Sequence, residues 1–522
     1  MPVVVSHIDA DFERLAARAL RQAALADLVE VRLDRLRELR PEALAAFVAA
    51  CPKPVIAACP GPEAHGEFPG PVEERLEVLR VAARAGCRFV DVDQRLSLDL
   101  GEVEAPCHRI VSRHELDGTP LDLAALHEEV RAVLYEGDIV KIVTHAECAE
   151  DGLRVLNYLR VCGGGLVAFC SGAAGSFTRL LAPIFGSPFT YAAPADLPGE
   201  ETGDLTGPGQ LRVNDFLALA PPGGLSGETA IFGVVGVTAR HSWSPRVHGM
   251  ALKAARLDAL YLAFEPRTIE SFLELASDES FRGFSITAPY KGGAAAFASS
   301  LDGASERAGA ANTLIREGRG WRGLNTDVGA VAQSLGAALA QSGLMASMES
   351  ACADVAVLPG GESARAGSLR EAHTLVLGCG GAARAVCQAV REAGGSFTVA
   401  GRDAERAASL ARELGGECAA WESIPAIEHD VLVHCTPVGS VGSEGESPIP
   451  AQWLREGTIV MDAVYRPMRT ALMAAAEERN CLPVPGREWF VRQASAQFRL
   501  FTGHAVDEAI MRAAFEHAAD GK

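Results

Sequence analysis

The feature that most constrains the fold is a regular alternation of short apolar segments with helical stretches in residues 1–218. The segments are rich in β-branched residues, and Ala/Leu/Arg/Glu-rich stretches of helical period separate them. Such a pattern predicts buried parallel strands, each followed by a helix. Eight repeats favour a compact (β/α)8 barrel, with an open doubly wound sheet as the alternative. The segments begin at Val3, Leu28, Pro54, Phe89, Arg109, Ile139, Leu166 and Phe189.

A break rich in proline and glycine, ALAPPGGLSGET at 218–229, predicts a linker over 219–229. A mixed α/β segment with the strands IFGVVGV, YLAFE, GFSITAP and AANTLI follows. In HTLVLGCGGAARAV a strand then runs into a glycine-rich turn and a helix. The later strands FTVAGR, VLVHCT and TIVMDAV complete a pattern typical of a Rossmann-type dinucleotide-binding sheet.

These patterns predict three domains. We expect a barrel over 1–218, an α/β domain made of 230–332 and 488–522, and a dinucleotide-binding domain over 333–487. The stretch from about 342 to 368 lacks a sustained apolar stripe, so we interpret it as a surface insertion and assign it no chemistry.

Charge and composition exclude several classes of partner. The chain has 48 Lys and Arg against 67 Asp and Glu, and its net charge of −19 repels nucleic acid and anionic membranes. No apolar run approaches the ~18–20 residues that cross a bilayer, and no basic leader precedes a cleavage site, so we expect a cytoplasmic protein. The 13 cysteines and 13 histidines lack CxxC or HExxH spacing, so we expect no metal.

The glycine-rich turn indicates a phosphate-bearing cofactor. Gly378, Gly380 and Gly381 follow an apolar strand and precede a helix, so a pyrophosphate can approach free N–H groups at the start of that helix. The next strand ends in Ala-Gly-Arg, where a cation can pair with a ribose 2′-phosphate. Arg402, with Arg406 one helical turn later, therefore favours NADP over NAD, the alternative being two solvated arginines.

Polar residues in separate motifs characterise the second half. In HSWSP, Ser242 and Ser244 can point the same way from an extended segment and bind a carboxylate or a diol. Lys291, the Asn312 of ANT, and Asp327 in LNTD follow in order. With TxPxK, NTDxG, GxGGAxxA, CTPVG, DAVYRPxxT and GxxWFVRQA, the chain from about Glu228 onward resembles shikimate dehydrogenase.

This resemblance implies a catalytic pair, Lys291 and Asp327, beside the substrate hydroxyl. Such a pair can relay a proton during hydride transfer, whereas a simple ion pair is the structural alternative. The resemblance also implies that Ala382, Thr436 and Gly486 join the glycine turn and Arg402 in holding NADP. The residues implied to bind shikimate are Ser242, Ser244, Thr287, Asn312, Tyr465 and Gln493.

Two positions depart from the shikimate dehydrogenase pattern. The family's usual Asn near CTPVG appears as His434 or Cys435, and its GxxM motif appears with Arg487 to Trp489. Both departures concern the side of the site that faces the nicotinamide.

In the first half, Lys141 interrupts the apolar strand DIVKIVT. A lysine is costly to bury in its charged form, and a desolvated amine is what imine formation with a ketone requires. His114 ends the preceding strand and can share the barrel mouth as a proton shuttle, although a histidine there is often structural. Other strand ends are also polar, including EVRLD at Glu30 to Asp34, and Asp91 and Asp93.

These motifs carry a second resemblance. With EVRLD, SRHELDGTP, VKI, a GxxGxxxR run and PGQ in order, residues 1 to about 216 resemble type I 3-dehydroquinate dehydratase. The resemblance implies that Lys141 forms an imine with the substrate ketone and that His114 moves the protons. It further implies that Arg179 holds the carboxylate, and that the hydroxyls are bound by Glu30, Arg32, Thr206 and Gln210.

The loop after the third strand departs from this second pattern. The family usually has an arginine followed by an EGG-type loop, but here Pro60 and Ala64 occupy those positions. Glu63, His65 or Glu67 are the candidates to replace the missing groups.

The two resemblances describe consecutive reactions, because dehydration of 3-dehydroquinate yields the ketone that shikimate dehydrogenase reduces. The sequence therefore predicts a bifunctional enzyme with small-molecule substrates. One alternative is a working dehydrogenase fused to a barrel that serves as a binding or scaffold module. A second alternative is a quinate dehydrogenase that uses NAD.

Overall fold

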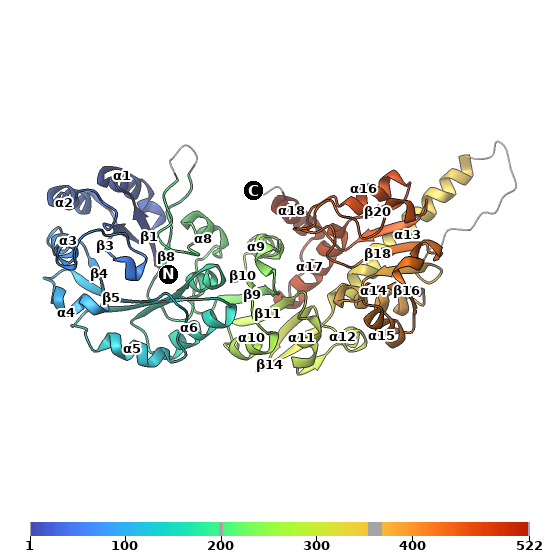
Figure 1. The fold of residues 1–522 in the computed structure, drawn as a ribbon, viewed down its shortest axis with the longest axis horizontal. Coiled ribbons are helices and arrows are strands. Elements are labelled where there is room, and N and C mark those ends of the chain that lie inside the picture. The colour runs from blue at the N-terminus through green and yellow to red at the C-terminus, as the bar shows by residue number, and fades with distance from the viewer. Residues whose placement is uncertain (1, 198–201, 353–367, 520–522) are drawn as a thin grey trace. The chain divides into compact units, whose positions relative to one another are not determined.

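The computed structural model describes residues 2–197, 202–352 and 368–519 (Figure 1). The chain divides into two units, Met1–Ile231 with Arg256–Phe281, and Phe232–Ala255 with Arg282–Lys522. Of the expected linker 219–229, residue 219 ends α8 (Val213–Leu219), and residues 220–229 are turn and coil before β9 (Ala230–Val235). Of the expected insertion at 342–368, residues 353–367 lie outside the described part, and its beginning belongs to α13 (Thr326–Cys352).

All eight predicted N-terminal segments are strands, which confirms the alternating pattern. The strands form a parallel sheet in the order β7-β6-β5-β4-β3-β2-β1-β8. Helices follow the strands and lie outside the sheet (Figure 1). The strands are β1 (Val3–Ile8), β2 (Leu28–Arg32), β3 (Val55–Ala58), β4 (Phe89–Asp93), β5 (His108–Glu115), β6 (Ile139–His145), β7 (Leu166–Ser171) and β8 (Thr190–Ala192).

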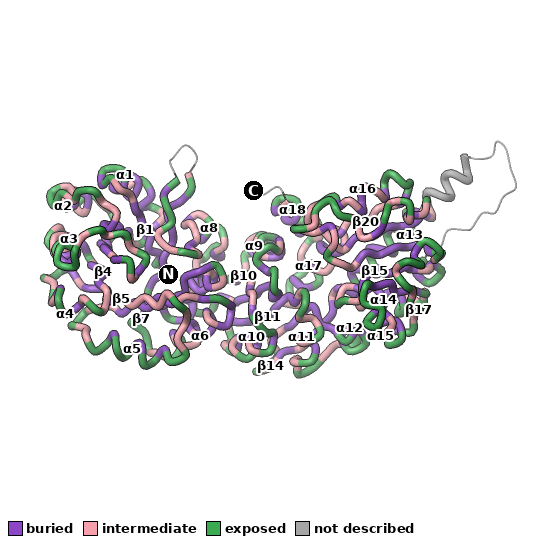
Figure 2. The backbone as a smooth tube through the Cα atoms, in the orientation of Figure 1, coloured by how far each residue is buried: buried purple, intermediate pink, exposed green. Residues whose placement is uncertain are grey.

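Side chains close the barrel between its two edge strands. β7 and β8 end the hydrogen-bonded order, and the rings of Phe169 and Tyr191 meet between them with centroids 5.6 Å apart. Apolar residues from alternate positions of several strands, among them Val4, Ile56 and Ile110, fill the interior. This packing removes about 25 cal/mol per Å² of apolar surface from water, which makes it the main stabilising contribution. Figure 2 shows the buried strands inside a layer of partly exposed helices.

Helices cover the barrel, and one further helix packs on it from later in the chain. Asn157 of α6 donates to the Leu275 carbonyl at the end of α10 at 2.9 Å, and Phe177 of α7 contacts Phe264 of β10 (Ala259–Phe264) at 5.0 Å. The helices of this unit are α1 (Phe12–Gln22), α2 (Pro41–Ala50), α3 (Val72–Arg84), α4 (Ser97–Leu100), α5 (Leu123–Arg131), α6 (Ala149–Val161), α7 (Phe177–Leu181), α8, and α10 (Ile269–Leu275).

The second unit contains two sheets. In the first, β9, β11 (Phe281–Ile286), β13 (Thr313–Glu317), β14 (Gly320–Leu324) and β12 (Ser300–Leu301) are neighbours in that order, and β13 and β14 form an antiparallel hairpin. Short helices connect these strands: α9 (Ser244–Ala254), α11 (Lys291–Phe297) and α12 (Gly303–Ala308).

The second sheet is parallel, with the order β17-β16-β15-β18-β19-β20. Since chain order reverses on either side of β15, this is the strand order of a Rossmann fold, as predicted. Its strands are β15 (His373–Leu377), β16 (Ser396–Ala400), β17 (Glu417–Ala419), β18 (Val431–His434), β19 (Ile459–Asp462) and β20 (Leu482–Val484). The helices around it are α13, α14 (Gly381–Glu392), α15 (Ala404–Leu414) and α16 (Ala471–Glu478). Helix α17 (Gly486–Thr502) packs on α13, and α18 (Glu508–Ala519) packs on α9 and α17.

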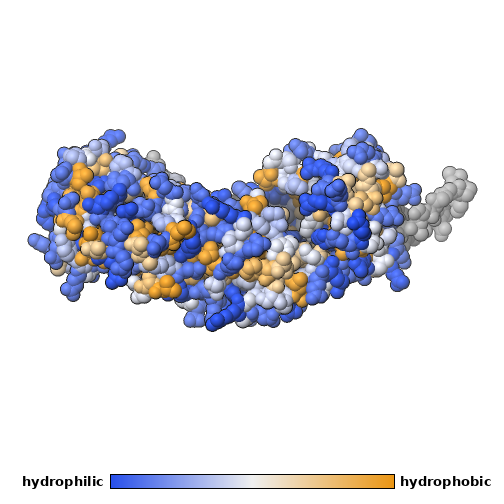
Figure 3. Space-filling view, turned by 60° about the horizontal axis from the view of Figure 1, so that its bottom comes forward, coloured by the Kyte–Doolittle hydropathy of each residue, from blue (hydrophilic) through white to orange (hydrophobic). Residues whose placement is uncertain are grey.

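The surface is mostly polar. The face drawn in Figure 3 is largely hydrophilic, with small separate hydrophobic patches. Within the described ranges, no helix is both long enough and apolar enough to span a bilayer.

Candidate active sites

A cavity opens at the carboxyl ends of the barrel strands, where parallel strands direct their last side chains into one mouth. Every first-half residue that the sequence singled out for chemistry lines it. These residues are Glu30, Arg32, His114, Lys141, Arg179, Thr206 and Gln210.

Strand register brings Lys141 and His114 to the same face. In the pairing of β5 with β6, Ser112 lies opposite Lys141 and His114 lies opposite Val143. Residues two apart on a strand share a face, so all four side chains point into the barrel. The four residues accordingly line the cavity.

Lys141 is buried and paired with a carboxylate. Its side chain is 9% exposed, its Nζ donates to Asp91 Oδ2 from β4, and it lies 5.1 Å from the centre of the Tyr191 ring. Asp91 was noted only as one of the polar strand ends, and its contact with Lys141 was not predicted. This carboxylate holds the amine at one place in the cavity.

His114 is neutral at ordinary pH. Burial, followed by the nearby Lys141 cation, lowers the pKa of His114 to about 3. Its Nδ1 is buried and has no hydrogen-bond partner among the described residues. A neutral imidazole can accept a proton, which is what a general base in this cavity must do.

Arg179 is the cation in this cavity that best fits an anionic ligand. It lies in α7, close behind β7, and its guanidinium stacks 4.2 Å from the Phe169 ring centre. Burial lowers the pKa of Arg179 to about 10, and no carboxylate pairs with it in the part of the chain that the structure describes. Arg32, by contrast, is bound to Asp34 at 2.7 Å. A carboxylate ligand would therefore compensate the buried charge of Arg179.

The remaining polar residues form a hydrogen-bonded rim. The Thr206 hydroxyl donates to Gln210 Oε1 at 2.9 Å, and Arg32 donates to the Thr206 carbonyl at 3.0 Å. Ser6 donates to Glu30 Oε1 at 2.5 Å, and burial raises the pKa of Glu30 although the Lys141 cation opposes this shift. These groups are therefore preorganised donors and acceptors for hydroxyl groups.

The loop that departs from the dehydratase pattern also reaches the cavity. Pro60, Ala64 and His65 line it, whereas Glu67 is bound to Arg35 on the exposed surface. Glu63 instead accepts a hydrogen bond from Arg75 at 2.6 Å.

Arg75 is a cavity residue that the sequence analysis missed. It comes from the first turn of α3, is 7% exposed and lines the cavity. Its Nη1 lies where a Cβ on residue 61 would stand, only 1.8 Å away, so Gly61 makes room for the guanidinium. The available signal was a charged residue on the buried face of the helix VEERLEVL, next to Leu76 and Leu79.

A second cavity lies within the second unit and collects most of the second-half candidates. Ser242, Ser244, Thr287, Lys291, Asn312, Asp327, Ala382, Tyr465, Gly486 and Gln493 all line it. Lys291 at the start of α11 and Asp327 in the first turn of α13 form an ion pair of 2.6 Å.

The serine pair differs from the expected extended segment. Ser244 begins α9, and Ser242 precedes it by two residues. The Ser242 hydroxyl lies 3.1 Å from the Ser244 hydroxyl and accepts from the Ser244 N–H at 3.1 Å. The Ser242 hydroxyl thus lies against the first residue of α9, and both serines still line the cavity.

Other cavity residues are held in place by neighbours. Asn312 Oδ1 accepts from the Thr326 N–H at 2.8 Å, and its Nδ2 donates to the Thr326 hydroxyl at 2.9 Å. Burial raises the pKa of Tyr465, so its phenol stays protonated at neutral pH. Trp489, which was noted only as a departure from the family pattern, donates from Nε1 to Asp327 Oδ1 at 2.9 Å.

The glycine turn has the shape that a dinucleotide phosphate requires. Gly378 has φ +117°, and a Cβ there would stand 3.2 Å from the Cys435 backbone. Gly380 precedes α14 without a side-chain cap, which leaves N–H groups at this helix start for an anion. A Cβ on Gly381 would stand 2.9 Å from Lys291 Cδ, so glycine also admits the lysine.

The arginines expected at the 2′-phosphate are exposed and close to this turn. Gly378 donates to the Ala400 carbonyl at 2.8 Å, which brings the end of β16 beside the turn. Neither Arg402 nor Arg406 has a side-chain hydrogen bond or ion pair within the described ranges, and Asp403 is occupied in capping α15. These residues therefore fit NADP, the dinucleotide that carries the 2′-phosphate.

Not every candidate lines the second cavity. Gly378, Gly380, Gly381, Arg402, Arg406 and Thr436 lie outside its lining. The Thr436 hydroxyl is 2.5 Å from His434 Nε2, and His434 Nδ1 is 2.9 Å from Asp462 Oδ1. No group of three or more His, Cys, Asp or Glu side chains able to hold a metal occurs in the part of the chain described.

Comparisons with known families match both parts of the chain. The family model described as Type I 3-dehydroquinase matches residues 3–219, and that of the shikimate dehydrogenase substrate binding domain matches 234–314. A bifunctional 3-dehydroquinate dehydratase/shikimate dehydrogenase of Arabidopsis thaliana, described as chloroplastic, is 30% identical over 92% of this chain and 78% of its own length. A Dehalococcoides mccartyi shikimate dehydrogenase (NADP(+)) is 31% identical over 56% of this chain and 96% of its own.

Solved structures also match. The shikimate 5-dehydrogenase of Thermus thermophilus in complex with NADP(H) and shikimate is 29% identical, covers 55% of this chain and 99% of its own, and has a TM-score of 0.45. The dehydroquinate dehydratase and shikimate dehydrogenase structure from S. pombe covers 99% of this chain and 98% of its own, at 22% identity and a TM-score of 0.41.

Proposed function

This chain belongs to the family of bifunctional 3-dehydroquinate dehydratase/shikimate dehydrogenases, and we propose that its two cavities catalyse consecutive steps of the shikimate pathway. The barrel is a type I dehydroquinate dehydratase, a lyase, and the second part is an NADP-dependent shikimate dehydrogenase, an oxidoreductase. The first reaction turns 3-dehydroquinate into 3-dehydroshikimate, and the second reduces that ketone to shikimate.

In the barrel, Lys141 first passes a proton to its partner Asp91, and its neutral Nζ then attacks the ketone carbon; loss of water leaves an imine. The neutral imidazole of His114 removes the adjacent proton and then donates it to the leaving hydroxyl, which departs as water. Hydrolysis of the imine restores the Lys141 amine and releases 3-dehydroshikimate. Arg179 holds the substrate carboxylate, while Glu30, Arg32, Thr206 and Gln210 bind its hydroxyls.

In the second cavity, Lys291 Nζ donates to the ketone oxygen and supplies the proton that it gains on reduction, and Asp327 orients Lys291 through their ion pair. NADPH, when bound, would supply the hydride that the carbonyl carbon gains. The glycine turn, Arg402 and Arg406 are assigned to NADP, together with Ala382, Thr436 and Gly486. The residues assigned to shikimate are Ser242, Ser244, Thr287, Asn312, Tyr465 and Gln493.

The observation that carries the dehydratase assignment is the buried Lys141 in a cavity that also holds a neutral histidine and an arginine with no carboxylate partner among the described residues. A barrel kept only as a binding or scaffold module is not favoured, because this part matches the Type I 3-dehydroquinase model throughout. The domain boundaries and the cytoplasmic location stay predictions.

The test follows NADPH oxidation after purified protein receives either 3-dehydroquinate or 3-dehydroshikimate. The wild type is expected to oxidise NADPH with both substrates. Lys141→Ala abolishes oxidation with 3-dehydroquinate and leaves that with 3-dehydroshikimate unchanged, because only the first reaction needs the amine. Lys53→Ala, in the same barrel but outside the cavity, is the matched control.

Borohydride gives a direct measurement of the imine. Reduction in the presence of 3-dehydroquinate should leave a stable adduct on Lys141, detected by mass spectrometry of its peptide. If NADPH is oxidised with 3-dehydroshikimate but not with 3-dehydroquinate, and no adduct forms on Lys141, the dehydratase assignment is wrong and the dehydrogenase assignment stands. Absence of oxidation with either substrate would contradict both.

A further inference from the structure

The geometry points to Trp489 as a positioning residue for the dehydrogenase reaction, which orients the Asp327 carboxylate through its indole N–H. This inference rests on the proposed dehydrogenase function. Trp489 lies in the first turn of α17, lines the second cavity and is 6% exposed. Its Nε1 donates to Asp327 Oδ1 at 2.9 Å in a fully buried hydrogen bond.

The Asp327 carboxylate is held by a different donor at each oxygen. Lys291 Nζ donates to Oδ2 at 2.6 Å, and the indole takes Oδ1. Two donors on two oxygens define both the position and the plane of the carboxylate. The indole has a single donor and no acceptor, so within this site its only polar action is on Asp327.

The backbone around Asp327 supports the same orientation. Asp327 lies in the first turn of α13, where the helix dipole favours a negative charge. Its own N–H donates to Asn325 Oδ1 at 3.1 Å. The backbone therefore positions the residue, and the indole selects the rotation of the carboxylate that leaves Oδ2 on the lysine.

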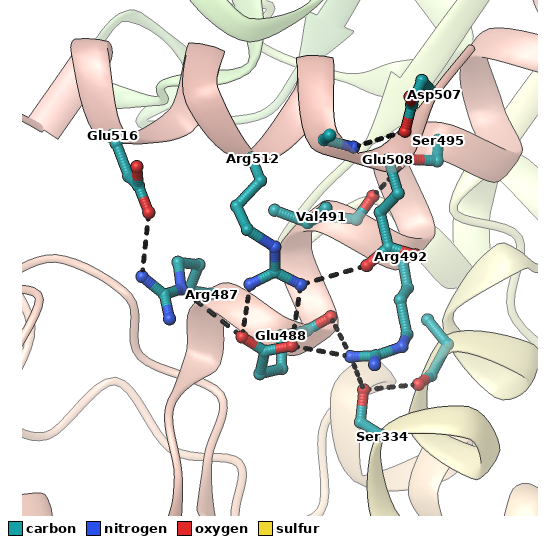
Figure 4. Close-up of polar contacts among 12 residues, drawn as sticks. Ser334, Arg487, Glu488, Val491, Arg492, Ser495, Asp507, Glu508, Arg512 and Glu516 are labelled. Atoms are coloured by element: carbon teal, nitrogen blue, oxygen red, sulfur yellow. Dashed lines mark hydrogen bonds and ion pairs between the residues drawn. The ribbon is translucent and has the colours of Figure 1, made fainter. Parts of the chain in front are cut away.

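A charged network holds the first turn of α17 against α13 and α18 (Figure 4). Glu488, next to Trp489, accepts from Arg512 of α18 at 2.6 Å and from Arg492 at 3.0 Å. Arg492 also donates to Ser334 of α13 at 3.2 Å. The Arg512 guanidinium lowers the pKa of Glu488 to about 2, so the carboxylate stays charged. The helix that carries Trp489 is thus tied to the helix that carries Asp327.

The test removes the N–H and keeps an aromatic ring. In Trp489→Phe, kcat for 3-dehydroshikimate reduction is expected to fall about tenfold or more, as for loss of a hydrogen bond to a charged group, with KM for both substrates within about twofold. Dehydratase activity stays unchanged. Trp321→Phe is the matched control, since Trp321 is 2% exposed, packs on Phe284 and lies outside the cavity lining.

Measuring kcat and KM separately distinguishes orientation of the Asp327 carboxylate from structural support of helix α17. Helix α17 also carries Gln493, which is assigned to the substrate, so a displaced helix would raise KM together with any loss in kcat. That outcome, or an unchanged kcat, overturns the inference. The slow residual reduction left in an Asp327→Asn background, measured at high enzyme concentration, should fall less than about twofold on adding Trp489→Phe, because the two residues act as one unit.

A spectroscopic measurement does not depend on turnover. The chain has five tryptophans, and the indole N–H signal missing in Trp489→Phe identifies Trp489 by nuclear magnetic resonance. Asp327→Asn should move that signal upfield and leave the other four in place; an unmoved signal refutes the contact.

Should Trp489→Phe not fold, Trp489→Met carries the same kinetic expectation. An inactive wild type would instead refute the dehydrogenase function.

Discussion

Burial shifts the pKa values of the ionisable residues in the barrel cavity. Water is excluded around His114, which keeps its imidazole neutral, and around Arg179, whose charge lacks a carboxylate partner in the described part. Burial also lowers the pKa of a histidine to which no catalytic role is assigned. His7 in β1 is fully buried, both its ring nitrogens lack hydrogen-bond partners among the described residues, and burial lowers its pKa to about 3.

His7 predicts a loss of stability in acid. Its folded pKa lies below its unfolded value, so protonation favours the unfolded chain. The contribution is full above about pH 6.5 and is lost as pH falls toward 3; at pH 4.5 the loss amounts to roughly 2–3 kcal/mol. His7→Gln cannot titrate, so its urea-unfolding midpoint should fall less between pH 7 and pH 4.5 than that of the wild type. Parallel decreases in both proteins would contradict this role for His7.

At the scale of elements, parallel pairing decides which residues meet. The predicted strands were located by their apolar runs, and all eight barrel strands lie where expected. Four strands of the second unit were not predicted, namely β12, β14, β17 and β20. Most of them are short and contain few β-branched residues, so pairing with a neighbouring strand rather than local propensity forms them.

The turn between β15 and α14 supports a prediction at this scale. In Gly378→Ala, the positive φ and the contact with the Cys435 backbone both strain the turn, so we expect weaker NADP binding and a loss of about 1–2 kcal/mol in stability. Dehydratase activity should not change. Calorimetric titration with NADP and a thermal melt measure the two effects.

Gly329→Ala is the control for that glycine. Gly329 is exposed on α13, and a Cβ there meets nothing within 4 Å. Alanine is the better helix former, so this variant should bind NADP normally and be at least as stable as the wild type. Unchanged NADP binding by Gly378→Ala would show that the turn tolerates a side chain.

For the molecule as a whole, each cavity is lined by residues of one unit only. Two variants that each lack one activity should therefore complement each other in solution. Lys141→Ala retains the dehydrogenase and Asp327→Asn retains the dehydratase, so their mixture should convert 3-dehydroquinate to shikimate after a lag while 3-dehydroshikimate accumulates.

The variants assayed separately are the controls for complementation. Lys141→Ala alone should leave 3-dehydroquinate unchanged, and Asp327→Asn alone should stop at 3-dehydroshikimate. Product analysis by chromatography distinguishes the three compounds. A mixture that forms no shikimate, although each variant retains its own activity, would show that the intermediate does not pass through solution.

The sequence alone determined the fold class and most candidate residues, because periodic apolar runs and motif residues act over short stretches of chain. Tertiary structure decided the partners of those residues. Asp91 meets Lys141 across 50 residues of chain and Trp489 meets Asp327 across 162, and Arg75 enters the barrel cavity from a helix. Such contacts depend on sheet order, register and helix packing, which bring distant segments together and which no local pattern encodes.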